Sequence, residues 1–124
     1  MIISRAPLRI SLGGGGTDLP FYANIYGGSL ITASINRYIY IMIGSREVEK
    51  NIKLNYSQTE LVEKIEDIKH PLIKEALKLV DIKDSIEIHS MADIAAGSGL
   101  GSSSTFLVAL LNGLNYYKGE TVSK

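Results

Sequence analysis

Apolar and polar residues alternate with the period of a β-strand through the first part of the chain. This spacing predicts strands over residues 2–12, 29–35 and 37–45, and a further short strand over residues 52–57. Pro7 has no N–H to donate, so the first of these is expected to form an edge strand, a bulge or two short strands. In the third, RYIYIMIGS, both faces are apolar, and we expect a central strand or one that is covered on both sides.

Two segments between and after these strands carry features of helices. Residues 19–26 favour a short helix closed by the pair Gly27-Gly28, because glycine most easily adopts the left-handed conformation of a helix end. At Ser57 the apolar spacing changes to that of a helix, and Ser57 with Glu60 has the form of a capping box. The helix that follows would bury Leu61, Ile65 and Ile68.

The second half of the chain predicts two more helices around one strand. Pro71 suits the first turn of a helix, where a missing N–H costs little. Residues 85–90 return to strand alternation, and residues 103–117 predict a final helix. The stripe that the Pro71 helix would bury consists of Leu72, Ile73, Ala76, Leu77 and Val80. This order of elements predicts an α+β fold, in which helices pack on one face of a mixed sheet.

Composition excludes several classes of partner. The chain has 124 residues, the size of one domain or of a piece of one. Its 13 basic and 13 acidic residues balance, so its overall charge favours neither a nucleic acid nor an anionic membrane surface. Cysteine is absent, which excludes disulfides and thiolate chemistry, and no apolar run approaches the roughly 20 residues that cross a bilayer. We expect a soluble, cytoplasmic protein.

The segment AAGSGLGSSST, just before the last helix, has a composition that suits phosphate. Gly97, Gly99 and Gly101 let bare backbone approach a ligand, and residues 102–104 are serines that fall where the first N–H groups of the helix lack partners. Those donors and the helix dipole favour an anion, and serine hydroxyls can reach a phosphate oxygen or Mg²⁺. A plain glycine-rich turn with serine caps would use the same residue types, which alone leave both interpretations open.

Two common nucleotide loops do not fit this segment. A P-loop ends in Gly-Lys-Ser or Gly-Lys-Thr, and no lysine lies between Lys83 and Lys118. A dinucleotide fingerprint reads G-x-G-x-x-G in a tight turn after a strand, whereas this loop reads G-x-G-x-G and residues 91–96 separate it from the strand. The segment is therefore not a Walker loop, and a Rossmann loop is disfavoured.

The segment LRISLGGGGTDLP contains one arginine, Arg9, which is always positively charged, and one carboxylate, Asp18, which accepts hydrogen bonds. Arg9 has a planar fork of donors, and Asp18, beside a run of glycines, could hold sugar hydroxyls by charge-assisted hydrogen bonds. Arg9 could instead form a salt bridge on a strand, and Asp18 could cap the helix that begins at Leu19; each residue alone slightly favours this structural role. His70, at a helix start, and His89, on the outer face of a strand, are interpreted as structural or solvent-facing.

Together, RAPLRISLGGGGTDLP and GSGLGSSST resemble the first and second motifs of the GHMP kinases, the superfamily of galactokinase, homoserine kinase, mevalonate kinase and phosphomevalonate kinase. The resemblance is strongest to kinases of D-glycero-D-manno-heptose 7-phosphate, which carry Gly-Gly-Gly-Thr-Asp-Leu-Pro and a later Tyr-Gly-Gly. It runs from Arg5 to about Lys124. It implies the GHMP kinase N-terminal domain, a ribosomal protein S5 domain 2-like fold.

The resemblance also implies a role for each matching residue. Arg9 would be catalytic, and Ser103, or its neighbour Ser102, would help to hold Mg²⁺. The residues that would bind ATP are Gly97, Ser98, Gly99, Leu100, Gly101, Ser102, Ser103 and Ser104. The residues that would bind the substrate are Gly15, Gly16, Thr17 and Asp18.

Two departures from the family pattern affect this comparison. Gly15-Gly16 replaces the Glu-His pair of galactokinase, which would leave space for a larger or phosphorylated sugar and argues against galactose. Ala95 stands where the second motif has a proline, so the loop is expected to be less rigid where it begins.

The implied reaction is phosphoryl transfer from Mg·ATP to a hydroxyl of a sugar phosphate, which for heptose 7-phosphate is the anomeric one. In the family, a catalytic aspartate, an acidic Mg²⁺ ligand, a third motif and a C-terminal domain all follow the second motif. Residues 1–124 are therefore expected to be a truncated N-terminal ATP-binding domain that binds nucleotide weakly and is inactive alone. Such a domain would pair with its missing C-terminal half or form a homodimer through an uncovered apolar face.

Two alternatives stay open. The protein could be another GHMP sugar kinase that acts on a fucose or octose derivative. It could also be a non-catalytic nucleotide-binding module, or a subunit whose partner supplies the second half.

Overall fold

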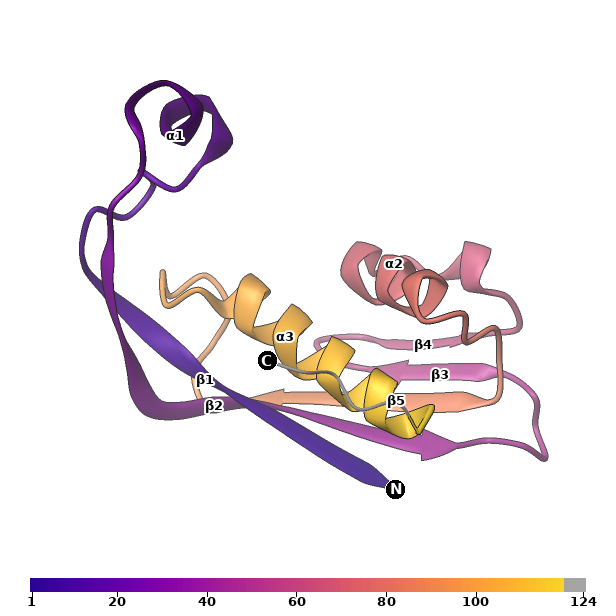
Figure 1. Cartoon of the computed structure of the whole chain (residues 1–124). Helices are drawn as coiled ribbons and strands as arrows, with labels where there is room; N and C mark the ends of the chain where they lie inside the picture. Colours follow the sequence, from indigo (N-terminus) through magenta and orange to yellow (C-terminus); the bar gives the residue numbers. More distant parts are fainter. Residues whose placement is uncertain (120–124) are drawn as a thin grey trace.

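The computed structural model describes residues 1–119, in which two helices cover one face of a mixed sheet (Figure 1). The sheet is five-stranded in the order β1-β2-β5-β3-β4, and every neighbouring pair is antiparallel except β3 and β5. The strands are β1 (Ile2–Gly13), β2 (Ile31–Ser45), β3 (Ile52–Asn55), β4 (Thr59–Val62) and β5 (Ile86–Ala92). The α-helices are α1 (Pro20–Tyr26), α2 (Pro71–Leu79) and α3 (Ser102–Tyr117). The predicted α+β architecture is confirmed.

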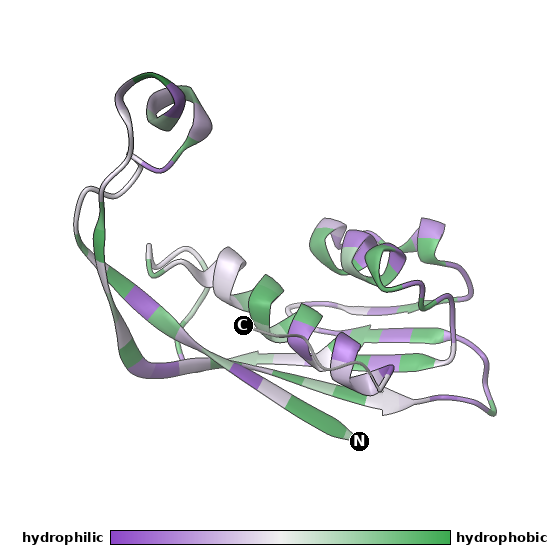
Figure 2. Cartoon of the chain, in the orientation of Figure 1, coloured by the Kyte–Doolittle hydropathy of each residue, from purple (hydrophilic) through white to green (hydrophobic). Residues whose placement is uncertain are grey.

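The core lies between the sheet and helices α2 and α3, as the strand alternation predicts. Ile39, Ile41 and Ile43 of β2 are buried on the helix side, together with Ile86 and Ile88 of β5. Figure 2 shows hydrophobic and hydrophilic residues alternating along β3 and β5. The helices contribute the predicted apolar stripe of α2 and, from α3, Phe106, Ala109, Leu110 and Leu114. Strand β2 is central, as expected, although the helices cover only one of its faces.

Strand β1 is an edge strand with a break in its pairing, which confirms the expectation from Pro7. The register with β2 shifts between Pro7 and Arg9, so Leu8 lies at the irregularity, and its side chain is almost fully buried. A bulge of this kind bends the strand and re-aims the side chains beside it. Arg9 is the first residue to pair again, opposite Ser34.

The predicted helix from Ser57 is wrong. Residues 59–62 form β4, which pairs with β3, and a short 3-10 helix (Ile65–Asp67) follows. The pairing satisfies the backbone hydrogen-bonding groups of β3 and β4 at the edge of the sheet. Because side chains of a strand point to alternate faces, Glu60 is then buried and Leu61 is exposed. Tertiary pairing here overrides the local capping-box pattern, and Ile65 and Ile68 reach the core from the 3-10 turn instead.

Strands β1 and β2 extend beyond the rest of the sheet as a two-stranded arm that ends in α1 (Figure 1). Helix α1 has no buried residue, and it ends at Gly27 with a φ of 74°, so the predicted glycine end is confirmed. The predicted strands 29–35 and 37–45 are one strand, β2. None of the helices within residues 1–119 has the length and apolarity that crossing a bilayer requires. The end of the predicted domain, residues 120–124, lies outside the described residues.

Candidate nucleotide site

The loop between β5 and α3 turns through glycines in the left-handed conformation. Gly97, Gly99 and Gly101 have φ angles of 84°, 74° and 69°, a region that residues with a side chain rarely adopt. Gly101 is the N-cap of α3, and no side chain caps this helix end. The first N–H groups of α3 therefore stay available, and they lie at the positive end of the helix dipole, as an anion site requires.

Arg9 lies directly against this helix end. Its backbone N–H donates to the carbonyl of Leu100 at 3.2 Å, which ties the loop to β1 just after the bulge. A Cβ built on Gly101 would lie 3.0 Å from Nε of Arg9, so the guanidinium packs against the Gly101 backbone. Within residues 1–119 Arg9 forms no ion pair, which leaves its charge beside the start of α3 without a carboxylate partner.

A cleft of about 410 Å³ lies beside the first turn of α3. Ser102 and Ser103 line it, and most of its other lining residues are apolar or aromatic. The other lining residues are Ile39, Tyr56, Ser57, His70, Leu72, Ser90, Met91, Ala92, Ile94, Ala96 and Phe106. Clefts with an apolar wall and a few convergent polar groups are typical ligand sites.

One wall of the cleft is held by a buried carboxylate that the sequence reasoning assigned to a capping box. Glu60 accepts hydrogen bonds from the Tyr56 hydroxyl at 2.7 Å and from the backbone N–H groups of Lys69 at 2.8 Å and His70 at 3.2 Å. Burial raises the pKa of Glu60, but these hydrogen bonds outweigh it, so the net pKa lies below its usual value. The same hydrogen bond to Glu60, followed by burial, raises the pKa of Tyr56.

His70 has a structural role, as interpreted, and it also lines the cleft. Its Nδ1 accepts a long hydrogen bond from the N–H of Ile73 at 3.4 Å, which makes it the N-cap of α2. Burial lowers the pKa of His70, so the ring is neutral at pH 7 and Nδ1 is free to accept. Its position before Pro71 was a usable signal for a helix start, but no sequence pattern connects it with Tyr56 or Phe106.

The other predicted site residues lie at the tip of the arm, away from α3 (Figure 1). Thr17 is occupied by the backbone, since its Oγ1 lies 2.7 Å from the Gly14 carbonyl and 2.9 Å from the Ser29 carbonyl, and it accepts from the Ser29 N–H at 3.1 Å. Gly15, Gly16 and Asp18 are exposed. Helix α1 begins at Pro20 with Leu19 as an uncapped N-cap, so the alternative of Asp18 as the helix cap is wrong.

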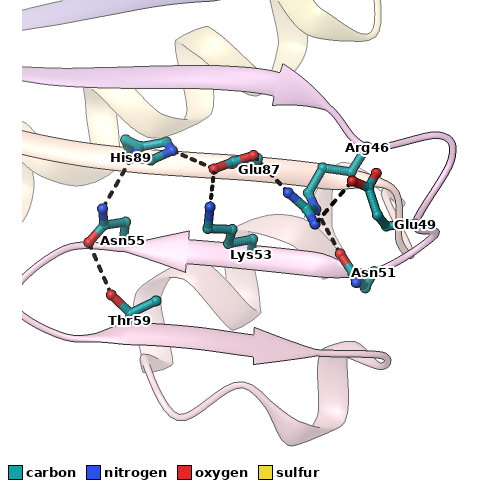
Figure 3. A network of polar contacts seen from close by, with 8 residues as sticks. All are labelled: Arg46, Glu49, Asn51, Lys53, Asn55, Thr59, Glu87 and His89. Carbon is teal, nitrogen blue, oxygen red and sulfur yellow. Dashed lines mark hydrogen bonds and ion pairs between the residues drawn. The ribbon is translucent and has the colours of Figure 1, made fainter.

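His89 belongs to a polar network on the sheet face that the helices leave open (Figure 3). Its Nε2 lies 2.7 Å from Glu87, which also pairs with Arg46 and Lys53 at 3.0 Å each. Hydrogen bonds with Lys53, His89 and Arg46 lower the pKa of Glu87 to about 2 against burial. The network stabilises neighbouring strands and lies on the other side of the sheet from the cleft. Residues 1–119 hold no cluster of three His, Asp or Glu side chains suited to a metal ion.

Known proteins are similar to this chain both in the segment that contains the glycine loop and in the overall fold. The family described as the GHMP kinases N-terminal domain matches residues 68–124, a segment that includes α2, β5, the glycine loop and α3. D-glycero-alpha-D-manno-heptose 7-phosphate kinase from Campylobacter jejuni is 34% identical over 122 residues. The chain is therefore similar to GHMP kinases, both in this segment and over most of its length.

Solved GHMP kinase structures share this architecture. A D-glycero-D-manno-heptose 1-phosphate kinase from Bacteroides thetaiotaomicron matches 96% of the chain at 30% identity with a TM-score of 0.84. The Streptococcus pneumoniae phosphomevalonate kinase, in complex with phosphomevalonate and AMPPNP, matches 99% at 17% identity with a TM-score of 0.73, which shows the fold alone. The chain spans 36% of the length of the curated relative and 42% and 39% of these two structures.

Proposed function

We propose that the chain is the nucleotide-binding part of a sugar kinase that transfers a phosphoryl group from Mg·ATP to a heptose phosphate. The observation that carries this proposal is the junction of the two motifs. The left-handed glycines 97, 99 and 101 lead into an uncapped helix end, and the Arg9 guanidinium lies against that end. Backbone donors, a helix dipole and a fixed cation then converge where a triphosphate would lie.

The cleft beyond this junction suits the rest of a nucleotide. Its apolar and aromatic wall matches a base, while Ser102 and Ser103 line it from the first turn of α3, where we place the phosphates. The Ser103 hydroxyl, with Ser102 beside it, would supply an oxygen ligand to Mg²⁺, which prefers oxygen and takes other ligands from phosphates and water. Bound there, the metal would neutralise charge on the phosphates.

The chemistry assigned to this chain is positioning and charge stabilisation. The sugar hydroxyl oxygen forms a bond to the γ-phosphorus, the bond from that phosphorus to the bridging oxygen breaks, and ADP leaves. Arg9 would stabilise charge on the transferred group, and residues 97–104 would hold the phosphates in place. In the family that the sequence resembles, an aspartate after the second motif accepts the hydroxyl proton, and we assign that step to none of the residues 1–119.

Titration of the chain with ATP, in the presence of Mg²⁺, tests the proposal. We expect Gly101→Val to weaken binding by about tenfold or more, because it strains a left-handed position and displaces Arg9. Ser103→Ala should weaken binding several-fold in Mg²⁺ and less in EDTA. Gly44→Val and Ser45→Ala are matched controls, since both lie on β2 and Gly44 has open space around it. ATP affinity that neither loop variant lowers would contradict the proposal.

The specific substrate is proposed from the relatives. The curated relative is named a heptose 7-phosphate kinase and the structure a heptose 1-phosphate kinase, and the glycines at 15 and 16 leave these two positions of the arm tip without side chains. We favour the 7-phosphate, with transfer to the anomeric hydroxyl. Fucose- and octose-type substrates are alternatives within the family, and a nucleotide-binding module without activity is the alternative outside it.

A further inference from the structure

We propose that Glu60 is a positioning residue for the nucleotide cleft, which holds Tyr56 and the turn at His70 so that they form a fixed aromatic wall for the base. The inference rests on the proposed function, because it assigns a task within the same cleft. It differs from a role in phosphate binding, since Glu60 lies behind the wall and does not line the cleft itself.

The burial of Glu60 requires an explanation. It is the one buried charged side chain within residues 1–119, with an exposed fraction of 7%, and it comes from an edge strand where solvent was available nearby. A buried carboxylate is costly unless hydrogen bonds satisfy it. Here, Oε1 accepts from Tyr56 and His70, and Oε2 accepts from Lys69, so the donors come from both sides of β4 in the sequence.

These hydrogen bonds hold two rings that line the cleft. The Tyr56 and His70 rings meet edge to face, with centroids 4.7 Å apart and an interplanar angle of 84°. His70 continues the contact to Phe106 of α3, with centroids 5.3 Å apart. Because Phe106 lies one turn after Ser102 and Ser103, the wall begins where the proposed phosphate site ends.

The arrangement gives Glu60 an effect on one half of the ligand only. A planar base would contact the ring surface that Glu60 holds, and aromatic surfaces of this kind favour flat apolar groups. The phosphates would contact the glycine loop and the start of α3, which have no bond to Glu60. Loss of the carboxylate should then weaken the binding of the base and leave the binding of the phosphates unchanged.

The test compares ATP with inorganic tripolyphosphate, which carries the phosphates without a base. Both probes are titrated against the wild-type chain and against Glu60→Ala, Glu60→Gln and Tyr56→Phe. We expect Glu60→Ala to weaken ATP binding at least fivefold and tripolyphosphate binding less than twofold. Glu60→Gln and Tyr56→Phe should weaken ATP binding two- to threefold, again without an effect on tripolyphosphate. Glu63→Gln is the matched control, an exposed glutamate just after β4.

The outcomes separate the possible failures. Equal weakening for both probes, or no change for either, would overturn the positioning role. A wild-type chain that binds neither probe would overturn the proposed function, and the inference with it. If Glu60→Ala fails to fold, the ratio of ATP to tripolyphosphate affinity in Glu60→Gln and Tyr56→Phe decides by the same rule. A further readout is base selectivity, since the preference for ATP over CTP should narrow in the Glu60 variants.

Discussion

At the scale of single residues, the backbone angles of the three glycines before α3 agree with the sequence, whereas the surroundings of two carboxylates were not predictable. A run of alternating glycines before a helix implies unusual backbone angles, and these three do have positive φ values. Glu60 and Glu87 were not predictable in this way, because a carboxylate reads as a surface residue until its partners are known. Only the sheet order brings Arg46, just after the end of β2, and Lys53 of β3 to Glu87, whereas His89 lies two residues further along the same strand.

Glu87 should make the folded state sensitive to acid. Its pKa in the folded chain is about 2, below the ordinary value of 4.5, so its stabilising effect is complete above pH 4.5 and is lost as the pH falls towards 2. We expect Glu87→Gln to lower the free energy of unfolding by about 1–3 kcal/mol at pH 7 and by little near pH 2. Urea unfolding at a series of pH values measures this difference.

The control for that series is Glu49→Gln. Glu49 contacts the same Arg46 at a longer 3.6 Å and is 51% exposed, so its replacement should cost no more than about 0.5 kcal/mol. A difference between wild type and Glu87→Gln that stays constant from pH 7 to pH 2 would show that the carboxylate charge is not the cause.

At the scale of elements, the helices and strands with the strongest local patterns were predicted correctly. The segment after Ser57 was predicted as a helix but forms β4, because it pairs with β3. Helix α2 was predictable because Pro71 and the apolar stripe agree, and α3 because its apolar run is long. The segment after Ser57 carried a helix signal of only a few residues, and the open edge of β3 offered it a partner strand. A pattern of a few residues carries no information about a partner strand, so β4 could not be predicted from the sequence.

Close backbone contacts hold the two sides of the arm together where residues 14–17 lie against residues 28–29, a region we call the neck of the arm. A Cβ at Gly14 would lie 2.0 Å from the Ser29 carbonyl oxygen, and one at Gly28 would lie 2.4 Å from the Thr17 carbonyl oxygen. Gly14 and Gly28 are therefore required because a side chain at either position would collide with the opposite backbone. The sequence had indicated only that Gly28 helps to close a helix. The Thr17 hydroxyl lies between the two sides of the neck.

Thr17→Val should loosen the arm tip without destabilising the core. The change removes the hydroxyl that bonds both sides of the neck, while α1 has no buried residue whose loss the core would register. We expect chymotrypsin to cleave within α1 about three to ten times faster, which corresponds to roughly 1 kcal/mol for the lost hydrogen bonds, with the Tm of the core nearly unchanged. Thr17→Ser keeps the hydroxyl and serves as the control. Equal cleavage of the Val and Ser variants would contradict this role.

At the scale of the whole molecule, the site combines elements that are distant in the sequence. The fold class and the glycine loop were predictable, and the resemblance to GHMP kinases connected Arg9 with the loop before any contact was known. The cleft wall was not predictable, since Tyr56, His70 and Phe106 meet only after α2 and α3 pack on the sheet. The tip of the arm, with α1, lies apart from the start of α3 (Figure 1).

Substrate choice also belongs to this scale, and a panel of sugars and sugar phosphates measures it. We expect ATP-dependent phosphorylation of heptose 7-phosphate to exceed that of heptose 1-phosphate, fucose and galactose by at least tenfold in kcat/KM. Arg9→Ala should lower kcat far more than it raises the KM for ATP, because the proposed task of Arg9 is to stabilise charge on the transferred group. A preference for an unphosphorylated sugar would count against the heptose phosphate assignment.

The contact between Arg9 and Gly101 has a consequence for the history of this sequence. Any side chain at position 101 meets the arginine first, at 3.0 Å from its Nε, so the two positions are not free to change independently. A lineage that loses the glycine is expected to lose the arginine as well, and one that keeps the arginine is expected to keep the glycine. Positions 9 and 101 should therefore be inherited as a pair, although most of the chain lies between them.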